Sequence, residues 1–368
     1  MRPDGTRVKD LPPLVAAIPY IMPKRYDAWN SVTENIDEEI IKDFIRTHRR
    51  AGVRLNHMSV IISAYYKAVL RNPKLNYFVM NGRIYRRNHF CVSFVILKKQ
   101  ANGVVNETTL KVYLDENDTV FTVNQKIADA IAANRAEHQS NSTDKFAKFM
   151  FSVPGLPKFV VWLAYHLDRH GLLPRKIIEL SPFHTSMFIT NLASIKTSYI
   201  HHHCYEFGTT SVFVCMGKPV PNYISGDLTR KMMPLGVVMD ERICTGYEYA
   251  AFCNDFRRYM RLPQMLELSA AFVYDAIKEQ LGIITDAIKT ILERTPPELG
   301  VDIIANGIYL TGGSARIRNL DQLLQKKTGI SVKVDEDPEM CVVRGLARVI
   351  NEKEFRPLAF VTKEQKYV

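Results

Sequence analysis

Cysteine is scarce in this 368-residue chain, and its six residues are scattered rather than paired. No two of them form a C-x-x-C pair, which argues against zinc ribbons, thioredoxin-like redox sites and metal sites of that kind. Most lie within apolar runs, where a free cysteine behaves as a small hydrophobic side chain. We therefore expect free thiols, no metal ion and a reducing, cytoplasmic location.

Long apolar runs are also missing. The run Phe159–Ala164 is far shorter than the roughly 20 residues that a membrane-spanning helix needs. The polar segment Met1–Asp10 lacks the apolar core of a secretory signal. Residues 145–174 contain helical pieces whose apolar face suits a membrane surface or, as we favour, packing against the rest of the domain.

Acidic residues are too few to balance the basic ones, and the net charge is +11. The last 101 residues hold 14 Lys+Arg and 14 Asp+Glu, so the first 267 carry the whole excess, with 35 against 24. A basic surface attracts nucleic acid, membranes or an anionic cofactor. Because no zinc-finger spacing or RNA-binding signature accompanies it, we expect no nucleic-acid partner.

What the chain does contain is a strand, a charged turn and a helix in close succession. The apolar run Leu235–Met239 predicts a buried strand. The turn Asp240-Glu241-Arg242 follows, and from Tyr247 the apolar residues recur at the spacing of one helix face. This order brings charged side chains to the end of a buried strand.

The turn resembles the active-site motif D-H-R-x-x-D-G of the chloramphenicol acetyltransferase and dihydrolipoyl acyltransferase superfamily. Asp240, Arg242 and Gly246 match that motif. Glu241 stands where the family has its catalytic histidine, and Thr245 where it has the second aspartate. The resemblance thus gives the catalytic positions as Asp240, Glu241, Arg242 and Thr245.

Further segments extend this resemblance over about residues 10–266. A helix ending in P-x-L-N precedes the hairpin signal Asn81-Gly82, as in the family. The strand Ser186–Asn191 resembles the family's T-x-S-N-x-G, with Thr190 in place of the serine that donates a hydrogen bond to the oxyanion. The resemblance implies a two-layer α/β sandwich, coenzyme A or acyl-coenzyme A, an unknown acceptor, and a homotrimer with sites between subunits.

Three adjacent histidines, His201–His203, admit more than one interpretation. Histidine clusters bind metals, but neighbours on an extended chain point to opposite faces. A displaced H-H-x-x-x-D-G motif is the second interpretation, although Phe207 stands at its aspartate position. We favour a surface loop or a subunit contact.

The chain changes character after Leu266, which suggests domains 1–267 and 268–368. The strings that begin at Leu292, Gly307 and Glu336 resemble the C-terminal part of MreB, the bacterial actin-like cell-shape protein, over about residues 269–350. The resemblance implies a small α/β fragment in which the turn Gly312-Gly313-Ser314 is a remnant of a nucleotide site. Without a D-x-G-T/S phosphate loop, we expect no ATP.

Three functions follow from these resemblances. The first is a coenzyme-A-dependent acyltransferase whose activity is altered, because a glutamate of reference pKa about 4.3 is a poor base for a thiol near 8.5. The second is a non-catalytic trimeric scaffold, a pseudoenzyme. The third is an accessory protein of MreB-type cell-shape filaments.

Overall fold

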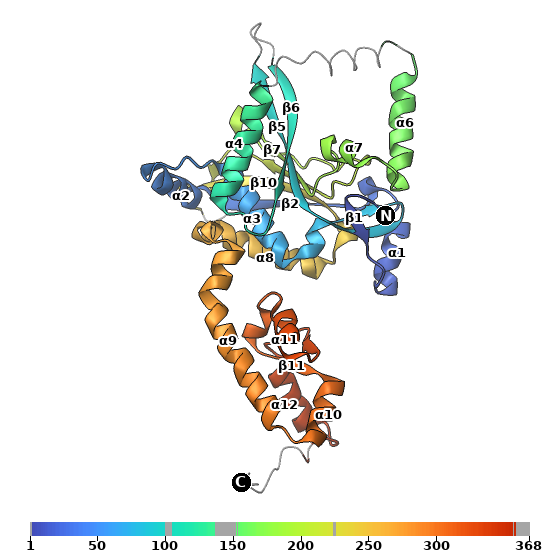
Figure 1. Ribbon diagram of the computed structural model, residues 1–368. Helices are drawn as coiled ribbons and strands as arrows, with labels where there is room; N and C mark the ends of the chain where they lie inside the picture. Colours follow the sequence, from blue (N-terminus) through green and yellow to red (C-terminus); the bar gives the residue numbers. More distant parts are fainter. Residues whose placement is uncertain are drawn as a thin grey trace. The chain divides into compact units, whose positions relative to one another are not determined.

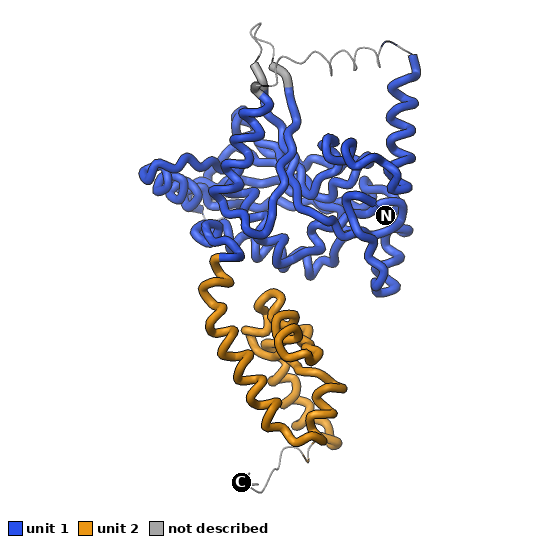
Figure 2. Tube along the Cα trace, in the orientation of Figure 1, with its two compact units in different colours: residues 1–271 blue, residues 272–368 orange. Residues whose placement is uncertain are grey.

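The computed structural model describes residues 2–99, 105–136, 152, 154–223, 226–355 and 357. It divides into two compact units, Met1–Ala271 (unit 1) and Phe272–Val368 (unit 2), shown in Figure 1 and Figure 2. The division falls a few residues after the boundary proposed from the sequence.

A seven-stranded mixed sheet forms the centre of unit 1 (Figure 1). Its strands are β2 (Trp29–Asp37), β5 (Phe90–Lys99), β6 (Val105–Leu114), β7 (Met187–Asn191), β8 (Val212–Met216), β9 (Val220–Pro221) and β10 (Lys231–Asp240). Their order is β2-β10-β8-β7-β5-β6, with β9 also pairing with β10. The pairs β5–β7 and β7–β8 are parallel and the others antiparallel.

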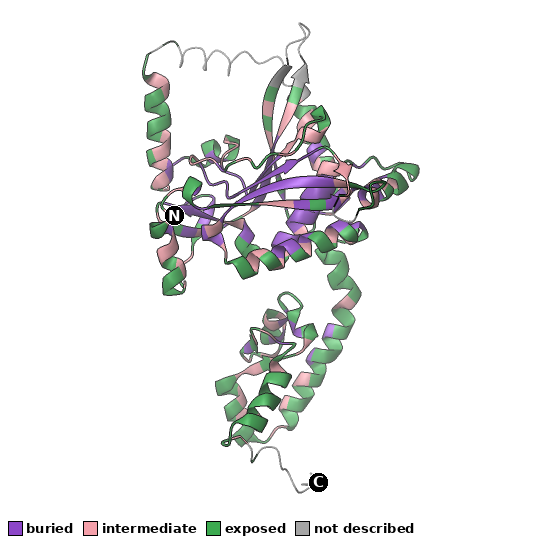
Figure 3. Cartoon of the chain, turned by 180° about the vertical axis from the view of Figure 1, so that it is seen from behind, coloured by how far each residue is buried: buried purple, intermediate pink, exposed green. Residues whose placement is uncertain are grey.

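Helices cover one face of this sheet and bury the main core against it. They are α2 (Glu38–Arg50), α3 (His57–Arg71), α4 (Val120–Ala136) and α8 (Gly246–Arg261). Alternate strand residues such as Ile189 and Val214 face these helices, whereas Phe188 and Phe213 face the other side. Figure 3 shows the buried residues concentrated along the sheet and α3. The predicted two-layer arrangement of a mixed sheet and helices is confirmed.

A second sheet in unit 1 has the order β1-β4-β3. Its strands are β1 (Gly5–Arg7), β3 (Tyr77–Met80) and β4 (Arg83–Arg87). Asn81 and Gly82 both have positive φ, 51° and 69°, as a type I′ turn requires, so the predicted hairpin is present. The remaining elements are α1 (Pro13–Ile21), α6 (Leu156–Arg169), α7 (Arg175–Leu180) and the 3-10 turns η1 (Arg25–Asp27), η2 (Pro73–Asn76), η3 (Leu192–Ile195), η4 (Glu241–Ile243) and η5 (Pro263–Glu267).

The segment 145–174 departs from our expectation. Residues 145–151 and 153 lie outside the described part of the chain, and α6 occupies 156–169. Its side chains from Phe159 to Leu163 are exposed, Trp162 by 53%, so this face does not pack on the rest of the unit. Among the described residues, no helix has the length and apolar character to cross a bilayer.

Unit 2 is a small α/β arrangement around two short parallel strands, β11 (Ile308–Leu310) and β12 (Val332–Val334). Its helices are α9 (Ala270–Arg294), α10 (Pro297–Asn306), α11 (Leu320–Thr328) and α12 (Cys341–Asn351), with the 3-10 turn η6 (Gly313–Arg316). Helix α10 is not among the elements expected from the sequence. Proline at the first helical position also starts a helix, which Pro297 does.

Candidate functional site

The predicted strand, turn and helix of the D-E-R-I-C-T-G segment are present as β10, η4 and α8. Asp240 and Arg242 are both buried and form a two-pronged ion pair, Oδ1–Nε at 2.8 Å and Oδ2–Nη2 at 2.7 Å. The remaining Arg242 nitrogen, Nη1, donates to the Met22 carbonyl at 2.9 Å. These two side chains therefore satisfy each other and hold the turn in place.

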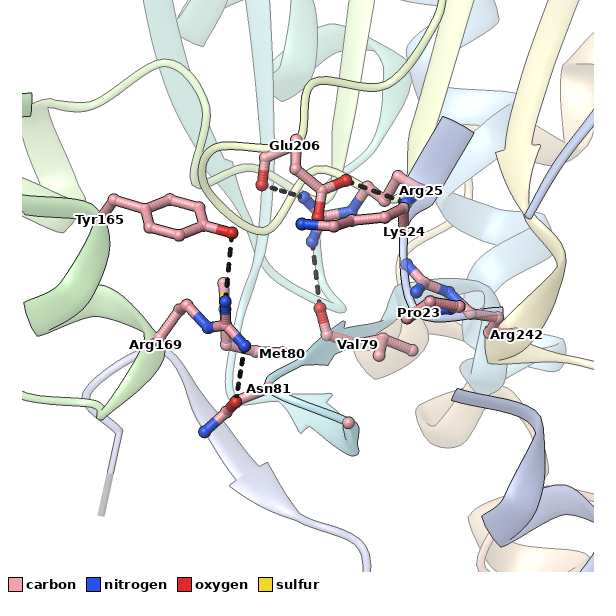
Figure 4. A pocket seen from close by; sticks show the side chains of 11 residues that line it. Pro23, Lys24, Arg25, Val79, Met80, Asn81, Tyr165, Arg169, Glu206 and Arg242 are labelled. Atoms are coloured by element: carbon pink, nitrogen blue, oxygen red, sulfur yellow. Dashed lines mark hydrogen bonds between the residues drawn. The ribbon is translucent and has the colours of Figure 1, made fainter. Parts of the chain in front are cut away.

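Arg25 adds a second buried cation to this pair, with its Nε 3.7 Å from Asp240 Oδ2. It also donates to the carbonyls of Tyr205, Glu206 and Val79. Arg25, Arg242 and Glu206 line a polar cavity of about 90 Å³, with Tyr165 and Arg169 on its far wall (Figure 4). The cavity is far smaller than the 300 Å³ or more of typical cofactor sites.

Glu241 and Thr245 occupy the two altered motif positions. Glu241 is half-buried, its backbone N–H donates to the Ala28 carbonyl at 2.7 Å, and no described residue pairs with its carboxylate. Thr245 is exposed and begins α8: its Oγ1 accepts from the N–H of Glu248, whose carboxylate accepts from the Thr245 N–H. Thr245 thus acts as a helix cap in this structure.

Thr190 lies elsewhere, on the face of the sheet that the helices leave uncovered. It shares that face of β7 with Phe188 and is half-buried. Thr190 lines an open cavity of about 510 Å³. The aromatic part of the wall consists of Phe183, Phe188, His202, Tyr205 and Phe213. Within the described ranges, no group hydrogen-bonds to the Thr190 hydroxyl, so it is available to a ligand.

One chain does not bring Thr190 and Glu241 together. Thr190 is in register with Cys215 of β8, and Cys215 with Gly236 of β10. Glu241 comes five positions after Gly236, just beyond the end of β10, which is roughly 17 Å along the strands and two strand spacings sideways. Within one copy of the chain, Thr190 and Glu241 are therefore apart, and a site that combined them would need residues of two copies.

The histidine run belongs to a segment that crosses this uncovered face between β7 and β8. The crossing is close: a Cβ on Gly236 would lie 2.4 Å from the Ile200 carbonyl oxygen, which explains a glycine in mid-strand. His202 stacks on Phe213, with ring centroids 4.0 Å apart and planes 7° from parallel. No three His, Cys, Asp or Glu side chains of the described residues gather as a metal site would require.

His202 therefore reaches the Thr190 cavity, which the sequence analysis did not anticipate. The three histidines look alike in sequence, and only the crossing segment decides which one faces the sheet. Phe207, the position that argued against a displaced motif, packs against Phe183 and His184.

A second set of buried charged side chains holds the N-terminal residues against the rest of unit 1. Arg2 pairs with Asp4 at 3.0 Å and with Asp168 at 2.7 Å, and His184 lies 3.1 Å from Asp168. Burial alone would raise the pKa of Asp168, but His184 and Arg2 together lower it below its usual range. None of these four residues lines either cavity, so we assign the network to structure.

In unit 2, the turn at Gly312 has the φ of 83° that favours glycine. Its N–H donates to the Pro338 carbonyl at 2.7 Å and is not free for a phosphate. Gly313 and Ser314 are exposed and begin η6. The nucleotide-binding role suggested for these three residues stays a prediction.

The C-terminal part of the chain is similar to a known protein family. The model of the MreB/Mbl protein family matches residues 257–356. Over 96 residues the chain is 38% identical to the cell shape-determining protein Mbl of Bacillus subtilis strain 168, covering 26% of this chain and 29% of Mbl. Over 84 residues it is 46% identical to MreB of Escherichia coli K12, covering 23% and 24%. The MreB resemblance is confirmed, and the chain spans about a quarter of the length of these relatives.

Solved structures similar to this chain include proteins of the predicted acyltransferase superfamily. A probable dihydrolipoamide acetyltransferase from Listeria monocytogenes is 12% identical and covers 70% of this chain and 95% of its own, with a TM-score of 0.43. A chloramphenicol acetyltransferase is 10% identical and covers 70% and 99%, with a TM-score of 0.42. Similarity at this level does not establish the function of unit 1.

Proposed function

We propose that unit 1 is a coenzyme-A-dependent, acyltransferase-like protein that binds an acyl thioester in the Thr190 cavity. The observation that carries this proposal is the unpartnered Thr190 hydroxyl in a cavity of about 510 Å³ with aromatic walls. That volume lies within the range of small-molecule sites. A hydroxyl held at the end of a strand suits hydrogen bonding to a developing oxyanion.

The charge distribution supports an anionic ligand such as coenzyme A, which carries phosphates. All of the +11 excess falls within the first 267 residues. Such a surface raises the local concentration of anions and their rate of association, with a strong dependence on salt. Binding of acyl-coenzyme A should therefore weaken as ionic strength rises.

Assembly into a homotrimer forms part of the proposal. Because Thr190 and Glu241 lie at opposite ends of the sheet in one chain, a site that uses both would need two copies. Sedimentation velocity of the full chain at micromolar concentration should show a trimer. A monomer under these conditions would contradict this part.

Calorimetric titration of the full chain with acetyl-coenzyme A tests the ligand. We expect saturable binding that Thr190→Val weakens, because the isosteric change removes only the hydroxyl. Thr197→Val, at an exposed position of the crossing segment, is the matched control and should bind as the natural chain does. Absence of heat at any salt concentration would refute the proposed ligand.

A non-catalytic scaffold is favoured by one observation at the altered motif. The side chains of Asp240 and Arg242 pair with each other, and the side chain of Thr245 caps α8, so these groups stabilise the fold. Under this alternative, Glu241→Gln changes nothing, and Glu241→His with Thr245→Asp creates acetyl transfer that the natural chain lacks. Loss of an existing activity in Glu241→Gln would instead make Glu241 the base.

An accessory role at cell-shape filaments is favoured by the MreB/Mbl match over residues 257–356. That match favours a nucleotide in unit 2 over its absence, which weakens our expectation of no ATP. We keep the narrower prediction that ATP is not hydrolysed, because a fragment of a nucleotide cleft cannot position both phosphate and magnesium. Saturable ATPase activity that Gly312→Asp abolishes would disprove it.

A further inference from the structure

We propose that His202, and not Glu241, is the proton acceptor in the Thr190 cavity, where it activates the acceptor of an acyl group. This inference rests on the proposed function and names the base for it. His202 lies 39 positions before Glu241, outside the altered motif. The two residues are also separated in space: only His202 lines the cavity that contains Thr190.

The position of the His202 ring is fixed from two sides. Its face stacks on Phe213, with centroids 4.0 Å apart and 7° between planes, and Phe213 in turn stacks on Phe188 at 4.9 Å and 12°. The backbone just before it is held by the Ile200 N–H, which donates to Cys215 Sγ at 3.5 Å. The close approach of Ile200 to Gly236 restricts the crossing segment further. A ring held this way keeps one orientation toward the cavity.

The protonation pattern of His202 follows from its hydrogen bond. Nδ1 lies 3.0 Å from the His203 carbonyl oxygen, and a carbonyl only accepts, so Nδ1 carries the proton. The neutral ring then has its lone pair on Nε2. None of the described residues forms a hydrogen bond with Nε2. His202 thus presents a free proton acceptor in the cavity that Thr190 lines.

The neighbouring histidines do not share this arrangement. His201 Nε2 lies 3.1 Å from the Val32 carbonyl and 3.3 Å from Thr33 Oγ1, at the β2 edge of the sheet. His203 is exposed, with its ring 5.9 Å from that of Trp29. Neither lines the Thr190 cavity. His201 serves as the matched control of the same residue type, whereas His203 does not, because its ring lies 5.1 Å from that of His202.

The reaction that this arrangement supports is acyl transfer from a thioester to a thiol, hydroxyl or amine. His202 Nε2 takes the proton of the acceptor while the acceptor atom bonds to the carbonyl carbon. The carbonyl π electrons move to oxygen, and the resulting oxyanion accepts a hydrogen bond from Thr190 Oγ1–H. When the carbonyl re-forms, the carbon–sulfur bond breaks. The leaving thiolate takes the proton from the imidazolium, which restores neutral His202.

The test uses the full chain, with acetyl-coenzyme A as donor and dihydrolipoamide as acceptor, and follows S-acetyl product by mass spectrometry. His202→Gln and His202→Phe, the latter keeping the stack on Phe213, should each lower kcat by about 100-fold or more with little change in KM. His201→Gln, whose ring lies at the β2 edge of the sheet, should stay within about threefold of the natural chain. The rate should rise with pH as a histidine deprotonates, and this limb should vanish in both His202 variants.

Full kcat in His202→Phe, or an unchanged pH limb, would overturn the assignment while leaving acyl transfer intact. Absence of transfer by the natural chain would count against the proposed function and the base together. Nitrogen-15 NMR tests the assignment of His202 independently of the proposed acyl transfer. The inference requires the Nδ1–H tautomer of His202 and a perturbation of its Nε2 signal on adding acetyl-coenzyme A. A Nε2–H tautomer would refute the assignment whatever the activity.

Discussion

Unit 2 has the clearer sequence similarity to known proteins, whereas unit 1 has the larger buried core. Unit 2 is 38–46% identical to Mbl and MreB over its matched length, yet its core cluster has four buried residues: Leu281, Leu320, Leu324 and Val332. Unit 1, of which the family model matches only the last residues from 257 on, has a continuous core across six strands of its central sheet and four helices. Sequence similarity therefore says little about how completely a segment buries its own apolar surface.

The core of unit 2 is small because many of its apolar side chains remain exposed. Its helices α9, α10 and α12 keep large aliphatic side chains exposed, among them Ile283, Ile304 and Ile350. The matched relatives are about four times longer than the matched segment. A segment selected within a longer chain carries apolar residues for neighbours that lie outside the segment. We therefore expect unit 2 to be the less stable unit.

The largest effect should come from the buried charges of unit 1. Asp240→Asn leaves Arg242 and Arg25 buried without a counter-charge, which we expect to lower the free energy of unfolding by about 3–5 kcal/mol. In unit 2, Asp337→Asn affects only the exposed pair with Arg316 and should change it by less than about 1 kcal/mol. Urea unfolding followed by tryptophan fluorescence reports unit 1 alone, because Trp29 and Trp162 are the only tryptophans, so Asp337→Asn is followed by circular dichroism.

A small loss for Asp240→Asn would mean that water reaches the ion pair. The matched control within unit 1 is Asp43→Asn, whose pair with Arg46 is exposed on α2. It should leave the urea midpoint unchanged.

Truncating one core leucine in each unit sharpens the comparison. Leu235 and Leu324 are both fully buried, and each change to alanine should cost about 2–5 kcal/mol. Unit 1 should remain folded in Leu235→Ala, since its core is large. Unit 2 should lose its helices in Leu324→Ala, because a core cluster of four buried residues contributes too little stability to offset the loss of one of them. Circular dichroism measures the helix loss, and an unchanged tryptophan signal would show that unit 1 is unaffected.

Local patterns predicted most elements. The helix Glu38–Arg50 follows from a local pattern, because Asp37 caps it and its apolar residues share one face. The hairpin at Asn81-Gly82 and the strand–turn–helix around Asp240 follow from equally local signals. These features depend on neighbours within a few residues.

Contacts between distant residues were not predictable in this way. The pair Arg2–Asp168 joins residues 166 positions apart, and no spacing rule links them. The Thr190 cavity and its His202 depend on how the segment between β7 and β8 crosses the sheet. The separation of Thr190 from Glu241 follows from strand order, which a motif cannot reveal.

Acid should destabilise unit 1 through His89, whose pKa is lowered to about 4 by burial and by Arg87. Between its unfolded pKa near 6.5 and its folded pKa, the unfolded chain binds more protons than the folded one. The stabilisation is therefore complete above about pH 6.5 and is lost as pH falls toward 4, by about 2–3 kcal/mol. His89→Gln should flatten this change in urea midpoints between pH 7 and 4.5, whereas His170→Gln, at an exposed site, should not.

The smallest effect should come from Thr245, and it separates helix capping from chemistry. Thr245→Ala removes the Oγ1 that accepts from the Glu248 N–H and should cost about 1 kcal/mol. Thr245→Asp replaces one good cap by another and should stay within a few tenths of a kcal/mol of the natural chain. If Thr245 only caps α8, acetyl transfer by Thr245→Ala at a temperature where it is folded should equal that of the natural chain. Thr245→Ala and Thr245→Asp differ in a carboxylate and not in the sheet that carries Thr190. If Thr245→Ala loses kcat and Thr245→Asp restores it, with both variants folded, the aspartate position of the motif takes part in catalysis.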